Sequence, residues 1–239
     1  MKLRDLKLVA CKADLTQIPE GKVLINTINA HSYNVAQKDA LFAEALMKGD
    51  YLIPDGASIV KACSLLKMTP RPKERIAGWD LFEFEMNKLN AREGGGKVMF
   101  MGSSEAVLAK IKEKVALVYP KLETLTYSPP YKPEFTEEDN KAIIDAVNQA
   151  DPDLLWIGMT APKQEKWIWS HWNELNIKCH TGTVGAVFDF FAGTARRAPV
   201  FWQKCGLEWL YRLIINPKRM WRRYVIGNPL FVWNILTIG

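Results

Sequence analysis

The stretch YLIPDGASIVKACSLLKMTPRPKERIAGWDL, from Tyr51 to Leu81, decides the fold because it predicts a strand, a sharp turn and a helix in succession. Tyr51 to Pro54 is typical of a short buried strand, and Ala57 to Lys67 has apolar residues at helical spacing. Asp55 lies in the turn between them. Because open α/β sheets bind ligands at the carboxyl ends of their strands, Asp55 is a candidate site residue. A cap on the following helix is its alternative role.

The same order of strand and helix recurs along the chain. Apolar, β-rich runs predict strands at Lys22–Thr27, Tyr51–Pro54, Val98–Met101, Leu122–Tyr127, Leu154–Met159 and Ile177–Thr181. Helical spacing predicts helices at Val35–Met47, Ala57–Lys67, Trp79–Ala91, Ala106–Val118, Thr136–Ala150 and Pro162–Leu175. This alternation predicts an α/β fold, a mostly parallel Rossmann-like sheet with helices on both faces. No G-x-G-x-x-G follows any of the strands, which disfavours a nicotinamide-dependent oxidoreductase.

The composition narrows the class of protein. The chain has 239 residues, of which 48% are apolar, enough for a sizeable core. Its four cysteines are widely spaced without a C-x-x-C pair, and with three histidines they predict neither a disulfide framework nor a zinc site. The N-terminus is too densely charged for a signal peptide, so the sequence predicts a cytoplasmic protein with reduced thiols.

The positive charge is concentrated in the tail, which we define as residues 196–239. The tail has 8 Lys and Arg against 1 Glu, whereas residues 1–195 have 24 basic against 25 acidic residues. Tryptophans and tyrosines are mixed with these cations, which suits an anionic membrane surface, with nucleic acid as the competing partner. We therefore divide the chain into an α/β catalytic domain, 1–195, and a basic, aromatic C-terminal appendage, 196–239.

The appendage is predicted to lie on a membrane without crossing it. Its longest uncharged run has 16 residues, whereas a spanning helix needs roughly 20. Its helices are predicted to break at Asn216–Pro217 and Asn228–Pro229. Arg212, Arg219 and Arg222 fall close to one helical face and could bind phosphates, with a solvated basic face as the alternative.

Five further residues fall where a parallel sheet would present them to a ligand. Thr27 and Asn29 follow the first strand and could hold a sugar or base, or could serve ordinary turn chemistry. Arg75 stands at a helix entrance, where it could meet a phosphate together with free backbone N–H groups. Gly102 ends a strand and would let a ligand approach, and Gln164 follows another strand at the same edge.

A D-x-D sequence at Asp151 and Asp153 could be mistaken for the metal-binding signature of many sugar transferases. It precedes the strand at Leu154–Met159, so it belongs to the amino edge of the sheet, away from the predicted site. We therefore expect that the reaction uses neither a metal ion nor a cofactor.

Six motifs occur in an order that resembles one family along nearly the whole chain. They are TINA at 27–30, PDG at 54–56, ERIAGWDL at 74–81, APKQE at 161–165, FDFFAGTARRAP at 188–199 and GLEWLYRL at 206–213. Together they resemble the WecG/TagA/CpsF glycosyltransferases. One departure is Thr160, where a glycine is common in that family.

The resemblance implies an inverting, metal-independent transfer of a sugar from a UDP-sugar donor to a polyprenyl-diphosphate-linked sugar acceptor, in surface polysaccharide or cell-wall polymer synthesis. The sugar implied is N-acetylmannosamine or its uronic acid, or in some members glucose, and the acceptor is undecaprenyl-diphosphate-linked N-acetylglucosamine. The place implied is the inner face of the cell membrane, with the protein bound peripherally.

The resemblance also implies roles for particular residues. Asp55 matches the proposed catalytic base, and the pocket residues of the family match Thr27, Asn29, Arg75 and Gln164. Its membrane-docking arginines match Arg212, Arg219 and Arg222. The alternative function is a non-catalytic nucleotide-binding module that docks on a membrane or RNA through its basic tail. The aromatic tail also leaves open whether it meets a membrane or another copy of the chain in a homo-oligomer.

Overall fold

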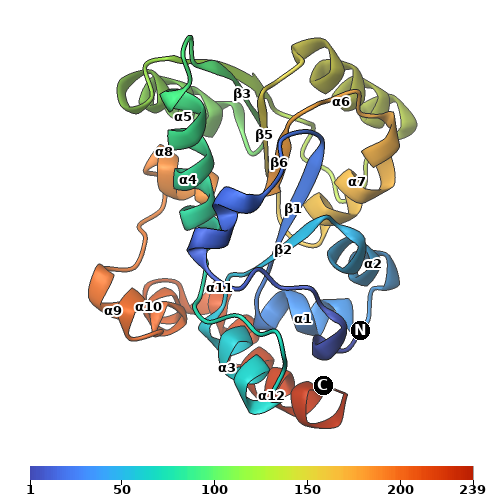
Figure 1. The fold of residues 1–239 in the computed structure, drawn as a ribbon, viewed down its shortest axis with the longest axis vertical. Helices are drawn as coiled ribbons and strands as arrows, with labels where there is room; N and C mark the ends of the chain where they lie inside the picture. The colour runs from blue at the N-terminus through green and yellow to red at the C-terminus, as the bar shows by residue number, and fades with distance from the viewer. Residues whose placement is uncertain (239) are drawn as a thin grey trace.

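One six-stranded sheet, in which all strands are parallel, forms the centre of the protein. The structure, a computed structural model, describes residues 1–238 (Figure 1). The strands are β1 Val23–Ile28, β2 Tyr51–Pro54, β3 Gly96–Gly102, β4 Leu122–Tyr127, β5 Leu154–Gly158 and β6 His180–Thr183. Their order in the sheet is β2-β1-β6-β5-β3-β4, which confirms the predicted parallel α/β fold.

Helices connect the strands and form the tail. Those of the first 195 residues are α1 Ala30–Ala36, α2 Ala40–Lys48, α3 Ala57–Leu65, α4 Gly78–Ala91, α5 Glu105–Val118, α6 Glu137–Ala150, α7 Lys163–His171 and α8 Val187–Ala192, with short 3₁₀ turns η1 Leu3–Asp5, η2 Lys12–Gln17 and η3 Trp172–Glu174. The tail has α9 Val200–Lys204, α10 Glu208–Ile215, α11 Pro217–Trp221, a π-helical turn η4 Arg222–Ile226, and α12 Gly227–Thr237.

The sheet is covered on both faces because its side chains alternate between two apolar layers. In β3, Val98 and Phe100 pack in the cluster that contains residues of α4, α5 and α8, whereas Met99 and Met101 pack with residues of α6 and α7. Figure 1 shows these two groups of helices on opposite sides of the strands. A continuous apolar strand is thus buried on both faces, as the sequence predicted.

One predicted helix is two helices. Val35–Met47 was expected to be continuous, but α1 ends at Ala36 and α2 begins at Ala40. Asp39 separates them, because its Oδ1 accepts a hydrogen bond of 3.0 Å from the backbone N–H of Phe42 and so caps α2.

The last strand begins later than predicted. The run Ile177–Thr181 was expected to pair, but the ladder between β6 and its neighbours starts at His180. Ile177 instead contributes to the apolar cluster beside α6 and α7. Gly182 lies within β6, and a glycine is needed there because a Cβ would stand 2.2 Å from the ring of Trp156.

The tail packs against the sheet domain near α1 and α3 (Figure 1). Phe231 of α12 meets Tyr33 of α1 edge to face, with ring centroids 5.5 Å apart. The predicted break at Asn216–Pro217 is confirmed between α10 and α11. The one at Asn228–Pro229 is wrong, because Pro229 lies in the first turn of α12, where a missing N–H costs little. Within residues 1–238, no helix combines the length and apolarity needed to span a bilayer.

Candidate active site

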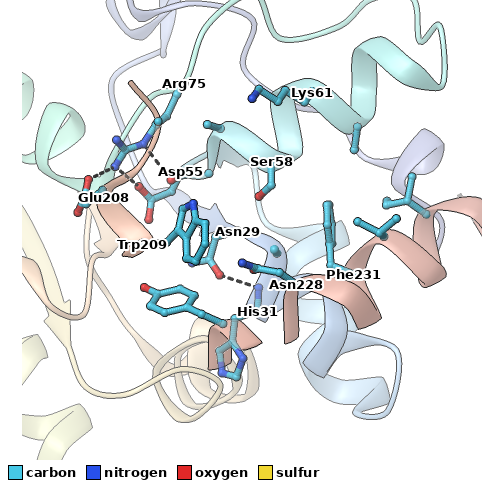
Figure 2. Close-up of a pocket in the computed structure, with 18 of the residues that line it drawn as sticks. Asn29, His31, Asp55, Ser58, Lys61, Arg75, Glu208, Trp209, Asn228 and Phe231 are labelled. Atoms are coloured by element: carbon cyan, nitrogen blue, oxygen red, sulfur yellow. Dashed lines mark hydrogen bonds and ion pairs between the residues drawn. The ribbon is translucent and has the colours of Figure 1, made fainter. Parts of the chain in front are cut away.

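A pocket of about 560 Å³ opens where β1 and β2 end, between α3 and the tail. Two walls come from the sheet domain, through the turns after β1 and β2 and through α3, and the others come from α10, η4 and α12. Figure 2 shows its labelled side chains converging from these elements. The pocket therefore exists only because the tail closes over the carboxyl edge of the sheet.

Asp55 and Arg75 face this pocket together, as the sequence predicted. Arg75 Nη2 lies 3.7 Å from Asp55 Oδ1, and Arg75 Nε donates a hydrogen bond of 3.2 Å to the Asp55 carbonyl oxygen. The backbone N–H of Gly78, the first residue of α4, donates to Asp55 Oδ1 at 3.3 Å. The alternative role of Asp55 as a cap of α3 is not seen, since Gly56 holds that position without a side-chain hydrogen bond.

The surroundings of Asp55 shift the pKa of its side chain upward. Burial raises the pKa of this carboxyl above its ordinary value, and Glu208 adds to the rise, although Arg75 and Arg212 oppose it. A carboxylate whose pKa is raised binds a proton more strongly than free aspartate does. Asp55 thus has the electrostatic setting of a general base.

Glu208 of α10 joins two arginines at the pocket wall. Its Oε2 accepts from Arg75 Nη2 at 2.8 Å, and its Oε1 accepts from Arg212 Nη2 at 2.8 Å. Burial opposes ionisation of Glu208, but Arg212 and Arg75 hold its pKa below the ordinary value. Glu208 is absent from the residues predicted for the site, although it is the one acidic residue of the tail and that isolation is a usable signal.

The three predicted tail arginines are not brought together. Arg212 lines the pocket, with its guanidinium 5.0 Å from the centre of the Phe190 ring. Arg219 and Arg222 are exposed and lie outside the pocket lining. Arg223 lines the pocket in their place, and burial lowers its pKa.

Asn29 reaches the pocket, and Thr27 lies beside it on β1. Asn29 Oδ1 caps α1 by accepting from the N–H groups of His31 and Ser32, at 3.0 and 3.1 Å, so that the turn role is confirmed. Its side chain also lines the pocket. Thr27 Oγ1 donates to the Thr183 carbonyl oxygen at 3.5 Å, and Thr27 does not line this pocket.

Gly102 and Gln164 lie at the same sheet edge but outside the pocket lining. β3 is four positions from β2, roughly 19 Å at the usual strand spacing. Gly102 has φ +118°, and a Cβ there would meet the carbonyl group of Gly158 at 2.7 Å, which accounts for the glycine by packing. Gln164 is buried, accepts from Met159 N–H at 3.1 Å and donates to Glu165 at 2.8 Å. Their binding roles stay predictions.

The D-x-D residues lie at the opposite edge, as predicted. Asp151 ends α6 in a left-handed conformation, and Asp153 Oδ2 accepts from the N–H of Lys97 at 2.8 Å, just before β5 begins. Both carboxylates are thus separated from Asp55 by the length of the sheet.

Comparison with known proteins identifies the family to which this chain is related. The profile of the glycosyl transferase WecG/TagA/CpsF family matches residues 5–238. The chain belongs to this family. The resemblance seen in the sequence motifs is confirmed, and the alternative of a non-catalytic module is not supported.

Several relatives of this chain have the same enzyme name. A protein of Bacillus subtilis (strain 168) is 29% identical over 213 residues, covering 89% of this chain and 78% of the relative. Proteins of Bacillus spizizenii and Staphylococcus aureus (strain MRSA252) are each 30% identical, covering 93% and 90% of this chain and 82% and 80% of their own lengths. All three are named N-acetylglucosaminyldiphosphoundecaprenol N-acetyl-beta-D-mannosaminyltransferase. This chain is therefore a glycosyltransferase that transfers a hexose.

Proposed function

We propose that this protein transfers N-acetylmannosamine from UDP to N-acetylglucosamine carried on undecaprenyl diphosphate, in the synthesis of a cell-wall polymer. Its named relatives act on that acceptor and transfer that sugar, according to their names. The tail would hold the enzyme peripherally on the inner face of the cell membrane, where the lipid-linked acceptor is concentrated. The pocket formed jointly by the sheet edge and the tail supports this assignment.

In the proposed reaction, Asp55 takes the proton from a hydroxyl group of the acceptor sugar as that oxygen attacks the anomeric carbon of the donor. Attack comes from the face opposite UDP, so a new glycosidic bond forms while the bond from the anomeric carbon to the phosphate oxygen breaks. The electron pair of that bond leaves with UDP, and the configuration at the anomeric carbon inverts. Arg75 and Arg212 neutralise charge that develops on the departing diphosphate.

The observation that carries the proposal is the position of Asp55 beside Arg75 at one end of the pocket. The 3.7 Å between their charged atoms brings a base and a phosphate-binding cation within reach of one substrate. Asp55 Oδ1 is engaged by Gly78 and Arg75, whereas its Oδ2 accepts no hydrogen bond from the part of the chain that the structure describes. Oδ2 is thus the oxygen that we propose accepts the proton of the acceptor hydroxyl group.

The direct test is a donor screen with purified protein and undecaprenyl-diphosphate-linked N-acetylglucosamine in detergent. UDP-N-acetylmannosamine, its uronic acid and UDP-glucose are compared with UDP-N-acetylglucosamine, by UDP release and by the mass of the lipid product. We expect acceptor-dependent UDP release with UDP-N-acetylmannosamine and a product heavier by one N-acetylhexosamine. Failure of all four donors to give an acceptor-dependent product would contradict the proposal.

We also propose that transfer needs no divalent metal ion. The D-x-D carboxylates that bind metal in many sugar transferases lie at the far edge of this sheet, where Asp153 is engaged by Lys97. Excess EDTA should therefore leave the transfer rate unchanged within about twofold, because cations of the chain meet the diphosphate charge. A loss of rate that Mg²⁺ or Mn²⁺ restores would show that a metal takes part.

A further inference from the structure

The pocket has two chemically different ends. Figure 2 shows Asp55, Arg75 and Glu208 gathered at one end and Phe231 at the other, with α3 along one side and α12 along another. The second end is a groove that we define by its apolar side chains, which come from α3 and α12: Ala62, Leu65, Phe231, Val232, Ile235 and Leu236. A ligand that fills both ends must itself have a charged part and an apolar part.

The apolar groove is open along its rim. Leu65 is 64% exposed, Val232 54% and Leu236 68%, although all three line the same cavity. Contiguous exposed apolar surface beside charged residues is typical of a binding groove, since covering it removes apolar area from water. The geometry therefore favours an apolar chain that enters along α3 and α12.

The charged end has binding capacity that the protein itself does not use. Lys61 and Arg223 line the pocket, and neither forms an ion pair within residues 1–238. The Nε–H groups of Arg212 and Arg223 are buried without a hydrogen-bond partner in the described part of the chain. Buried donors without partners are costly, so an anionic ligand that accepts from them is strongly favoured. Gly56 and Ala57, at the start of α3, line the same space.

We propose that this groove holds the lipid-proximal part of the acceptor, a polyprenyl diphosphate. The diphosphate lies against Lys61, Arg223 and the start of α3, and the first isoprenoid units lie between Leu65 on α3 and Val232 on α12. The remainder of the chain leaves through the open rim toward the bilayer. The identity of the acceptor rests on the proposed function, whereas the amphiphilic division of the cavity does not.

The volume of the cavity suits a part of the acceptor and not the whole lipid. Small-molecule pockets have volumes of about 300–1,000 Å³, and the 560 Å³ found here suits a diphosphate with a short apolar segment. Binding the chain next to its diphosphate fixes the direction of the acceptor, because the sugar on the other side of the diphosphate must then point toward Asp55. The groove would thus orient the acceptor hydroxyl for attack.

The test compares farnesyl diphosphate with inorganic pyrophosphate by titration calorimetry on the full-length protein, below the aggregation concentration of the lipid. Wild type should bind farnesyl diphosphate about tenfold or more tighter than pyrophosphate, because only the former fills the groove. Val232→Asp should remove most of that preference while pyrophosphate affinity changes less than about twofold. Leu65→Asp, on the opposite wall, should do the same.

Val225→Asp is the matched control. Val225 is also an exposed valine of the tail, 42% accessible, but it does not line the pocket. Equal loss of farnesyl diphosphate affinity in Val225→Asp and Val232→Asp would overturn the proposal that the groove binds the isoprenoid chain. Equal affinity of the wild-type protein for the two probes would overturn it as well. Thermal unfolding checks that each variant is folded.

The groove and the proposed function can fail separately, because the calorimetric measurement needs no sugar transfer. If farnesyl diphosphate binds with the predicted sensitivity to Val232→Asp but no donor is used, the groove stands and the proposed function fails. If sugar is transferred but farnesyl diphosphate shows no preference, the function stands and the groove is wrong.

Discussion

Asp55 shows how one carboxylate can be adjusted by opposing neighbours. Burial and Glu208 raise its pKa, and Arg75 lowers it, with a net rise. Glu208 has a second effect, because it also binds Arg75 and Arg212 at 2.8 Å each and so fixes the two guanidinium groups beside Asp55. A residue far along the chain thereby controls both the orientation of the cations and the basicity of Asp55.

Glu165 gives a prediction about stability at the residue scale. It is 2% exposed, its Oε2 has no hydrogen-bond partner within the described residues, and burial raises its pKa from 4.5 to about 7. The folded state therefore binds more protons than the unfolded state between these values, so stability falls as pH rises through this window. The shift corresponds to about 3 kcal/mol.

Glu165→Gln should remove this dependence, because an amide does not ionise. Urea unfolding at pH 5 and pH 8 measures it: the variant should be more stable than wild type at pH 8 and similar to it at pH 5. Glu134→Gln, at an exposed position, is the control and should follow wild type. A pH slope that persists unchanged in Glu165→Gln would contradict the assignment.

The loops that carry the site residues could be predicted from the sequence, whereas the side chains that pair with them across the fold could not. Asp55, Asn29 and Arg75 follow recognisable strands or precede a recognisable helix, so their common edge could be predicted. Glu208 could not be predicted to bridge Arg75 and Arg212, because the pairing joins segments 133 residues apart. Only the docked tail brings them together.

In the tail, the break between α10 and α11 explains why the predicted row of arginines does not form. The spacing of Arg212, Arg219 and Arg222 assumes one continuous helix with 3.6 residues per turn. Asn216 instead has φ −137° and ψ 64°, outside the helical range, so α11 does not continue the register of α10. Arg223, and neither Arg219 nor Arg222, lines the pocket together with Arg212. The sequence predicted the break at Asn216–Pro217 but not the angle between the helices on its two sides.

The contact between α1 and α12 gives a prediction for the attachment of the tail. Asn34 Nδ2 donates to the Gly227 carbonyl at 2.7 Å, and Asn34 Oδ1 accepts from Asn234 at 3.0 Å, all within buried surroundings. Asn34→Ala leaves both partners unsatisfied and should cost about 1–3 kcal/mol. Hydrogen exchange of residues 227–237 should quicken more than that of β3.

The exposed Asn173 offers a control for this variant. Asn173→Ala should change the free energy of unfolding by less than about 0.5 kcal/mol and leave exchange in α12 unaltered. If Asn34→Ala left exchange in α12 as slow as in wild type, the hydrogen bonds would not be what holds the tail.

At the scale of the whole molecule, the tail places its cations and aromatic residues at one end. Figure 1 shows α9 to α12 together at the lower end, with α5 at the opposite end. Exposed apolar side chains of the tail include Phe201, Trp209, Trp221 and Trp233. Such a surface combines apolar contact with attraction to anionic lipids, which supports the proposed orientation of the pocket toward a membrane.

Vesicle binding tests this orientation. Each cation near an anionic bilayer contributes about 1 kcal/mol, so Arg219→Ala combined with Arg222→Ala should weaken partition onto phosphatidylglycerol vesicles by about 30-fold at low salt. Lys110→Ala combined with Lys112→Ala, on exposed positions of α5, removes the same charge from the other end and should have little effect. Equal weakening by both pairs would mean that net charge, and not the tail, governs binding.

The proposed role of Asp55 as the base of a sugar transfer in this pocket can be tested with the substitution Asp55→Asn. The measurement is the single-turnover rate from UDP-N-acetylmannosamine to the lipid-linked N-acetylglucosamine, with UDP affinity determined in parallel. We predict a rate lower by about 10²–10⁴-fold with UDP affinity nearly unchanged, while Asp145→Asn, an exposed control, matches wild type. A variant Asp55→Asn that transfers sugar at the wild-type rate would show that Asp55 is not the base.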